Sequence, residues 1–468
     1  MTTDSSRDDA SRDMDAVVAT RRFGYGAQPG EIAARATDPR ASVLAELEHP
    51  DAALLDDADL PDRSAVMRRF FDYRDERKAF RASTQLKGAE RGEAEREQLG
   101  PNPLQEIYRA EVLARIRRAT ATARPLLERL VAFWSNHLCI AANAGQVVRL
   151  LAGQFEREVI RPHVLGRFED MLVAAMRHPA MLSYLDNDRS VGPNSRAGQR
   201  TGKSLNENLA REILELHTLG VDGGYSQADV TDFARVLTGW GFEGAKGDRP
   251  GAFLFRPARH EPGAPTVLGR VYGQAGEAKG LAVLRDLAHH PSTARFLSVK
   301  LVRHFLGRVP AGDLVDRLAG VYLGSGGDLG ALTRALVAAP ELWRPERPVL
   351  TAPYDFLVAT LRASGAVPKD RQILRMLEVF GQPTWVPPSP AGWPDEAEAW
   401  LAPGALLERL DWAEMMAGIV DLPDDMDAYG RDILGAAYDP DTRLALRRAE
   451  SRRQAFVMLV MSPGFQRR

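Results

Sequence analysis

Apolar side chains recur at three- and four-residue steps along most of the chain, which is the spacing of amphipathic helices. The clearest stretch covers residues 104–138, where Pro125 either kinks one helix or separates two. The same spacing predicts helices over residues 146–161, 168–176, 205–219, 227–237, 276–287, 292–306, 313–322, 329–338, 353–364, 371–380, 406–417, 429–437 and 441–461. We therefore predict an all-α fold, a multi-helical orthogonal bundle-like array.

Residues 66–98 depart from this pattern, because acidic and basic residues alternate around a few aromatic anchors such as Phe70 and Phe80. This balance is typical of a partly exposed helix or helix pair. β-structure is expected only as a small insertion. Phe253–Phe255 and residues 266–268 are the clearest strand-like runs, and we predict that they pair with each other as a small β-hairpin.

Residues 1–15 are rich in Asp, Ser and Arg and are predicted to be disordered. Residues 16–468 are predicted to form a single large helical domain, with one weak point for a subdivision at residues 383–394. That segment carries Trp385 and Trp393, whose indoles favour a packed loop over a flexible linker.

Composition excludes several classes of protein. The 61 basic and 63 acidic side chains leave a formal charge of -2, so no overall field attracts nucleic acid. Cys139 is the only cysteine, which excludes an internal disulfide and a thiolate zinc cluster, and its apolar neighbours predict a buried, inert thiol. Since we find neither a secretory signal nor a run of about 18 apolar residues, we expect a cytoplasmic protein without a membrane span.

Three short phrases place amide, imidazole and carboxylate groups inside otherwise apolar helical segments. They are Asn136-His137, Asp186-Asn187 and Asn206-Glu207. Burying such groups is costly unless each one finds a partner or a ligand. Their concentration is the main argument for a functional site.

One chemical hypothesis is a divalent metal site formed by His137, His217 and His260, with a carboxylate from Asp186 or Glu207. Neutral imidazoles and carboxylates suit zinc, iron or manganese. The chain has no His-Glu-x-x-His motif. A divalent metal is therefore only a candidate, and the cofactor is otherwise unknown.

A second hypothesis is a metal-free hydrolase, in which one imidazole acts as base, a carboxylate orients it, and an arginine and an amide hold substrate or an oxyanion. The residues proposed for catalysis are His137, Asp186, Asn187, Asn206, Glu207, Arg211 and His217. Those proposed for substrate contacts are Asn136, Thr238, Trp240 and Trp393. No Gly-x-Ser-x-Gly elbow supplies a nucleophile, and the substrate, a small molecule or a peptide, is unknown.

A structural interpretation explains many of the same residues. Ser204 and Glu207 have the spacing of a capping box that starts the helix predicted at residues 205–219. Glu207 and Arg211 have the spacing of an ordinary i,i+4 ion pair, and His217 would bond a neighbouring carbonyl.

Phrases spread over nearly the whole chain resemble the signatures of the bacterial family catalogued as domain of unknown function 1800. They include FWSNH at 133–137, YLDN at 184–187, LNENLARE at 205–212, ELHTLGV at 215–221, LTGW at 237–240, GWP at 392–394 and SPGFQRR at 462–468. The resemblance implies a helical protein with no settled activity. It also implies a partner, because such proteins are often encoded beside a companion from the family called domain of unknown function 1501.

Two classes of function therefore stay open. A metal-dependent or hydrolytic enzyme predicts that the three polar phrases, with His217 or His260, surround one enclosed cavity. A non-catalytic partner or scaffold protein, acting with the companion-family protein through exposed faces such as residues 66–98, predicts that the same groups satisfy one another in a closed core.

Overall fold

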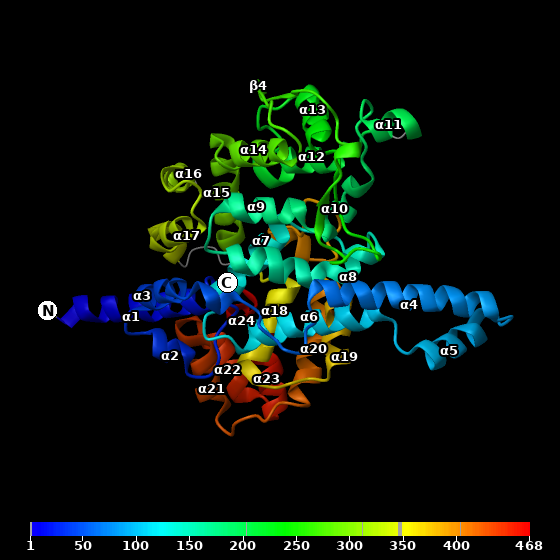
Figure 1. Ribbon diagram of the computed structural model, residues 1–468. Helices are drawn as coiled ribbons and strands as arrows, with labels where there is room; N and C mark the ends of the chain where they lie inside the picture. The colour runs from blue at the N-terminus through cyan, green and yellow to red at the C-terminus, as the bar shows by residue number, and fades with distance from the viewer. Residues whose placement is uncertain (1, 203, 311, 345–348, 403) are drawn as a thin grey trace.

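Helices form nearly all of the secondary structure in the computed structural model, which describes residues 2–202, 204–310, 312–344, 349–402 and 404–468 (Figure 1). The first part of the chain forms α1 (Thr2–Arg21), α2 (Glu31–Arg35), α3 (Pro39–Ala45), α4 (Arg63–Ser83), α5 (Gly88–Leu99), α6 (Pro103–Ala121), α7 (Pro125–His137) and α8 (Gln146–Phe155). The middle part forms α9 (Phe168–Arg177), α10 (Pro179–Tyr184), α11 (Arg196–Thr201), α12 (Asn208–Glu212), α13 (Gln227–Leu237), α14 (Glu277–Ala288), α15 (Pro291–Leu306), α16 (Leu314–Gly324) and α17 (Leu329–Ala338). The last part forms α18 (Pro353–Ser364), α19 (Asp370–Val379), α20 (Ala405–Ala417), α21 (Met426–Leu434), α22 (Pro440–Arg448), α23 (Arg452–Met461) and α24 (Pro463–Gln466). The predicted all-α class is confirmed.

The two most deeply buried helices are α7 and α18. In each of them almost every side chain is buried, including charged ones such as Arg129 in α7 and Arg362 in α18. Figure 1 shows α9 to α17 on one side of α7 and α8, and α18 to α24 with α1 to α3 on the other side. A helix that is apolar on nearly all faces belongs in the centre of a large core. None of the described helices is both long and apolar enough to cross a lipid bilayer.

Pro125 separates α6 from α7, which settles the alternative that the sequence left open. Proline is well placed at the first position of a helix, because the N–H that it lacks would have no partner there. Thr122 ends α6, and its hydroxyl accepts a hydrogen bond from the backbone N–H of Arg124 at 3.0 Å. The chain can therefore turn between the two helices without leaving that amide unpaired.

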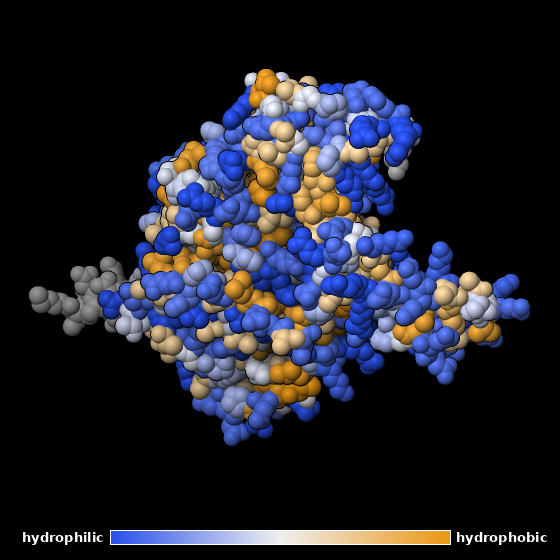
Figure 2. Space-filling model, in the orientation of Figure 1, coloured by the Kyte–Doolittle hydropathy of each residue, from blue (hydrophilic) through white to orange (hydrophobic). Residues whose placement is uncertain are grey.

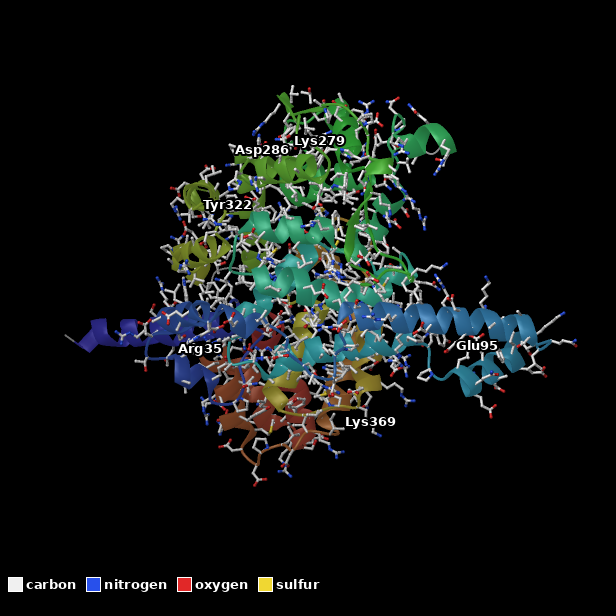
Figure 3. The ribbon with its side chains drawn as sticks, viewed as in Figure 1. Arg35, Glu95, Lys279, Asp286, Tyr322 and Lys369 are labelled. Atoms are coloured by element: carbon white, nitrogen blue, oxygen red, sulfur yellow. The ribbon has the colours of Figure 1, made fainter. Side chains whose placement is uncertain are left out.

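Helices α4 and α5 form an arm that projects from the body (Figure 1). Glu95 of α5 joins the two helices by ion pairs with Arg77 and Arg81 of α4 (Figure 3). The surface of the arm is mostly hydrophilic, with scattered hydrophobic spots (Figure 2). Of the two alternatives predicted for residues 66–98, a partly exposed helix or a helix pair, the structure has the helix pair.

The β-structure is a small insertion, as predicted, but its predicted pairing is wrong. β2 (Phe253–Phe255) pairs with β1 (Trp240–Phe242), and β3 (Thr266–Val267) pairs with β4 (Arg270–Val271). Asp229 instead holds the end of β3 against the first turn of α13, because its carboxylate accepts the backbone N–H of Leu268 at 2.7 Å. The two predicted runs are therefore strands of two separate hairpins.

The single helix predicted over residues 441–461 is two helices, α22 and α23. The hydroxyl of Ser451 accepts a hydrogen bond from the backbone N–H of Gln454 and so begins α23. A serine at this position stabilises a new helix start, which the apolar periodicity alone does not reveal.

Residues 2–15, for which the sequence predicts disorder, have helical conformation at the start of α1. Full burial begins at Ala16 and Val17, which pack against Ile32 of α2. The part of α1 that stabilises the body is therefore its second half.

Glu46, in the turn after α3, links the N-terminal helices to α7. Its carboxyl oxygens accept hydrogen bonds from Arg35 at 2.8 Å and from the backbone N–H of Leu126 at 2.8 Å, and Figure 3 shows Arg35 within the N-terminal helices. Burial raises the pKa of Glu46 to about 7, although Arg35 and the Leu126 amide oppose the shift. The folded protein therefore binds a proton here that the unfolded chain releases at a lower pH.

We expect this proton to make the folded state less stable as the pH rises. Relative to a Glu46→Gln variant, the wild type should lose up to about 3 kcal/mol of unfolding free energy between pH 4.5 and pH 7. Urea unfolding of both proteins across this range measures the difference. A constant difference would show that Glu46 has the same pKa in the folded and unfolded chains.

Candidate functional site

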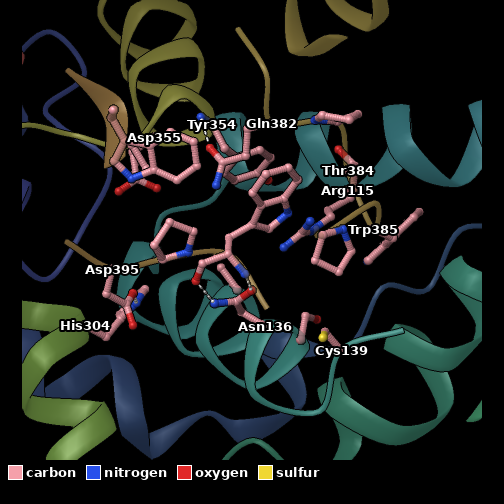
Figure 4. Close-up of a pocket in the computed structure, with 18 of the residues that line it drawn as sticks. Arg115, Asn136, Cys139, His304, Tyr354, Asp355, Gln382, Thr384, Trp385 and Asp395 are labelled. Carbon is pink, nitrogen blue, oxygen red and sulfur yellow. Dashed lines mark hydrogen bonds and ion pairs between the residues drawn. The ribbon is translucent and has the colours of Figure 1, made fainter. Parts of the chain in front are cut away.

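A cavity of about 90 Å³ lies between the central helices α7 and α18 (Figure 4). Its walls come from α6, α7, α15, α18 and the segment 382–400, which we call the tryptophan loop because Trp385, Trp393 and Trp400 all face the cavity. The lining side chains of α6 and α18, Arg115 and Tyr354, are buried, whereas Trp393 and Trp400 are half-buried. The cavity therefore opens beside the outer end of the tryptophan loop.

Glu156 organises the inner wall. One oxygen of its carboxylate accepts from Arg115, from the Ser135 hydroxyl at 2.9 Å and from the indole N–H of Trp385 at 3.2 Å, and the other accepts from Arg161. Burial by itself would raise the pKa of Glu156, but Arg115 and Arg161 outweigh it and hold the pKa below its ordinary value. Glu156 is therefore a charged group that ties four segments together.

The backbone carries Glu156 at the first residue of a π-helical turn, Glu156–Ile160, which directly follows α8. Turns of this kind are rare and are found mostly at functional sites. Arg161 follows the turn and also pairs with Glu128 at 2.8 Å. In this turn one oxygen of Glu156 pairs with Arg161, and the other accepts from the side chains of the cavity wall.

Among the described residues, Arg115 is one of the two arginines that line the cavity, and Figure 4 shows it beside Trp385. Its guanidinium lies 4.9 Å from the ring centre of Tyr354 and 5.6 Å from that of Trp385. Nε pairs with Glu156 at 3.0 Å, and within the described part of the chain this is its one ion pair. Because the side chain is still 10% exposed, its other nitrogens face the open space.

Three further groups on the wall are free to donate hydrogen bonds. Among the described residues, the Tyr354 hydroxyl has no hydrogen-bond partner, and Thr384 Oγ1 is buried without one. Gln382 uses its oxygen to accept the Tyr354 backbone N–H at 2.8 Å, which leaves its amide N–H groups unused. Together with Arg115, these groups form a set of unpaired donors.

The carboxylates at the cavity are, by contrast, already paired. Asp355 accepts from Arg129 at 3.1 Å and from Arg468 at 3.0 Å. Asp395 accepts from His304 Nδ1 at 2.8 Å (Figure 4), and Arg129 lies 3.3 Å from His304 Nε2. Arginine can only donate, so Nε2 of His304 is the acceptor of the Arg129 hydrogen bond. His304 therefore carries its proton on Nδ1 and donates this N–H as a hydrogen bond to Asp395. The cavity therefore offers donors rather than free acceptors.

The tryptophan loop is fixed to α7 by Asn136. Its amide donates to the Trp393 carbonyl at 2.8 Å and accepts the Trp393 backbone N–H at 2.7 Å, as the dashed lines in Figure 4 show. Gly392 has a φ of 88°, and a Cβ there would lie 2.6 Å from the Asn136 backbone oxygen. The prediction of a packed loop at residues 383–394 is confirmed.

Trp385 has a φ of 54°, a left-handed conformation that is strained for a residue with a side chain. Its carbonyl accepts the Ala142 backbone N–H at 2.7 Å, while its indole bonds Glu156. These two hydrogen bonds therefore hold the indole beside Arg115 in spite of the strained backbone. Cys139 also lines this wall, where its thiol is buried as predicted and burial raises its pKa to about 12.

His137 and His217 lie beside each other in the closed core rather than at the cavity. His137 Nε2 is 3.1 Å from the carbonyl oxygen of His217, and His217 Nδ1 is 3.2 Å from that of His137. Burial lowers the pKa of His137 well below its usual value and that of His217 to about 4. Both imidazoles are therefore neutral and cross-link α7 to the π-helical turn Ile213–Thr218.

Asp186 and Asn187 occupy different surroundings although they are adjacent. Asp186 is half-buried and pairs with Arg189 at 3.0 Å. Asn187 is buried, and its amide donates to the carbonyl of Leu237 at 3.2 Å. Asn187 therefore bonds the segment after α10 to the end of α13.

Asn206 and Glu207 lie at the start of α12, near Asp186. The predicted capping box is wrong, because α12 begins at Asn208 and the side-chain oxygen Oδ1 of Asn206, not the Ser204 hydroxyl, accepts the Asn208 backbone N–H at 2.9 Å. The predicted ion pair of Glu207 and Arg211 is confirmed at 3.0 Å. Hydrogen bonds to Glu207 from side chains of α13 lower its pKa.

His260 and Thr238 bond to each other near β1. His260 Nδ1 lies 2.9 Å from the Thr238 carbonyl oxygen, and Trp240 is buried 5.3 Å from the Phe253 ring. Within the described ranges, no three His, Cys, Asp or Glu side chains are grouped so that they could hold a metal ion. The predicted residues thus fall into separate groups, and of these only Asn136 and Trp393 line the cavity.

Sequence reasoning missed the cavity residues Arg115, Glu156, His304, Tyr354, Gln382, Thr384 and Asp395. Gln382, Thr384 and Asp395 lie in the tryptophan loop, and each of the others is a single polar residue in a separate segment. Outside the loop, therefore, no short motif contains two of them. The two indoles at Trp385 and Trp393 were the one available signal.

Comparison with known proteins gives a family and no activity. A family model described as a protein of unknown function (DUF1800) matches residues 18–467. No curated protein and no solved structure matches the chain.

Proposed function

The chain belongs to the DUF1800 family, and from that premise we propose that it binds a small anionic molecule, of the size of a short carboxylate, in the cavity between α7 and α18. The observation that carries the proposal is the surplus of unpaired donors. Arg115, Tyr354, Thr384 and Gln382 offer donors, while the neighbouring carboxylates are already paired. Buried donors of this kind are costly unless a ligand or water accepts from them.

The size of the cavity supports a small ligand. A single water needs roughly 10–15 Å³, so a cavity of about 90 Å³ has room for about six to nine groups of that size, which suits a small molecule and not a large cofactor. A carboxylate is planar and accepts from a guanidinium with matched geometry. Acetate is therefore a suitable first probe.

Calorimetric titration of acetate tests the proposal. We expect binding to the wild type and a loss of at least tenfold in affinity for Tyr354→Phe, which removes only the unpaired hydroxyl. Arg115→Gln should abolish binding, whereas Arg117→Gln, an exposed arginine on the same helix, should leave it unchanged. Absence of acetate binding to the folded wild type, or equal affinity in all four proteins, would overturn the proposal.

The finer hypotheses drawn from the sequence stay predictions. These are the metal-dependent or hydrolytic enzyme centred on His137 and His217, the single domain over residues 16–468, the bacterial origin and the cytoplasmic location. The partner or scaffold alternative also stays a prediction. The projecting arm of α4 and α5 supports it, because such an arm presents a large surface to another protein (Figure 1).

A further inference from the structure

Two of the indoles that line the cavity have no cation on their faces. Trp393 and Trp400 are both half-buried, and their ring centres are 5.9 Å apart at an angle of 44°. In the part of the chain that the structure describes, no guanidinium or ammonium group lies over either ring. The third indole, that of Trp385, already has Arg115 over it. The cavity therefore presents aromatic surface that a cationic group of a ligand can contact.

One carboxylate of the wall keeps its negative charge. Asp395 lies two residues after Trp393, lines the same cavity and accepts the His304 hydrogen bond through one oxygen. Because Nε2 of His304 accepts from Arg129, the ring is neutral, and the pair of His304 and Asp395 carries the charge of the carboxylate. The charge of Asp395 also acts on Lys300, but no ion pair joins these two residues.

Opposite charges lie on opposite sides of the cavity. Figure 4 shows Asp395 and His304 on one side, and Arg115, Thr384 and Trp385 on the other. Complementary charge is a general feature of specific binding sites. A molecule with one anionic end and one cationic end matches this distribution better than a simple anion does.

The shortage of free acceptors determines the chemistry of the cationic end. A primary ammonium group donates three hydrogen bonds and needs an acceptor for each, whereas the carboxylates of this cavity already accept from histidine and arginine. A quaternary ammonium group donates none. Aromatic faces, and those of tryptophan above all, attract such a group through the electrostatic field of the ring.

The volume of the cavity leaves room for this second group. Acetate would occupy roughly half of the space, which holds about six to nine water-sized groups. We propose that the ligand is a small betaine, with its carboxylate on Arg115 and its trimethylammonium group against Trp393 and Trp400. This inference rests on the proposed function and adds the ligand class to it. Glycine betaine, with about twice the non-hydrogen atoms of acetate, is of the right size.

Titration of the wild type at constant ionic strength with three ligands tests the inference. The ligands are acetate, glycine betaine and 3,3-dimethylbutanoate, which has the shape of glycine betaine but carbon in place of the cationic nitrogen. We expect glycine betaine to bind at least about tenfold more tightly than either of the other two, because the indoles attract the charge and not only the methyl groups.

Variants of the cationic end should change the preference for glycine betaine over 3,3-dimethylbutanoate. Trp400→Leu should remove most of it, and Trp400→Phe, which keeps an aromatic face, should retain much of it. Asp395→Asn keeps an oxygen that can accept from His304 but removes the charge, so it should reduce the same preference. Glu396→Gln changes an exposed carboxylate outside the cavity wall and is the matched control, with affinities equal to those of the wild type.

The outcomes separate the two proposals. Equal affinity for glycine betaine and 3,3-dimethylbutanoate, or for glycine betaine and acetate, overturns the betaine and leaves the anion site standing. Binding of tetramethylammonium as tight as that of glycine betaine overturns the placement of the carboxylate on Arg115. If neither acetate nor glycine betaine binds to the folded wild type, both proposals fail. These comparisons use the wild type alone, so they decide the matter even where a variant does not fold.

Discussion

Replacing Glu156 with alanine is expected to lower the free energy of unfolding by about 3–5 kcal/mol, as found when one partner of a buried ion pair is removed. Glu156 is buried and accepts from Arg115, Arg161, Ser135 and Trp385. Its loss leaves two buried guanidinium groups short of a partner and releases the indole that lines the cavity. Equilibrium unfolding in urea measures the change.

Glu158 provides the matched control, because it lies two residues further along the same π-helical turn. It pairs with Arg63 at 3.0 Å, and both side chains are about one-third exposed. Glu158→Ala should therefore cost less than about 1 kcal/mol. A double variant, Glu156→Ala with Arg115→Met, should recover part of the loss, because one unpaired cation is removed with its partner. Equal costs for the two glutamates would contradict the central role of Glu156.

The second large effect is expected at Gly392. Gly392→Ala should cost about 2–4 kcal/mol, part from the left-handed backbone and part from the contact with α7. The new Cβ would lie 2.6 Å from both the backbone and side-chain oxygens of Asn136, so the loop must move away. Acrylamide quenching of tryptophan fluorescence should increase as Trp393 leaves the cavity.

Gly381→Ala separates the two causes. Gly381 has a φ of 73°, but a Cβ there would meet no atom within 4 Å. It should show only the backbone cost, roughly 1 kcal/mol, with unchanged quenching. If the two variants behave alike, contact with α7 does not position the tryptophan loop.

Local patterns in the sequence predict the helices well, because each depends on neighbours within a few residues. α13, α17 and α18 have the predicted bounds. The strands show the limit of this reasoning. Phe253–Phe255 was predictable as a strand, but its partner Trp240–Phe242 is an apolar phrase at the end of a helix.

The candidate site shows the same limit more strongly. The phrases around His137 and His217 look functional because buried imidazoles are costly, yet one nitrogen of each ring bonds a backbone carbonyl that lies 80 residues away, and His137 Nδ1 has no partner among the described residues. Sequence spacing does not show which carbonyls a fold brings near. The π-helical turns that carry Glu156 and His217 also have no recognisable sequence signal.

The hydrogen bonds and the ion pair that close the cavity join residues that are far apart in the sequence. Trp385 bonds Glu156 across 229 residues, Asn136 bonds Trp393 across 257, and Arg129 bonds Asp355 across 226. Contacts over such separations form slowly, because a long loop must close before each is made. During synthesis from the N-terminus, Arg129 therefore lacks Asp355, and Glu156 lacks the indole of Trp385, until the second half of the chain has been made. The site is complete only after the tryptophan loop has been made, so it matures as one of the last parts of the protein.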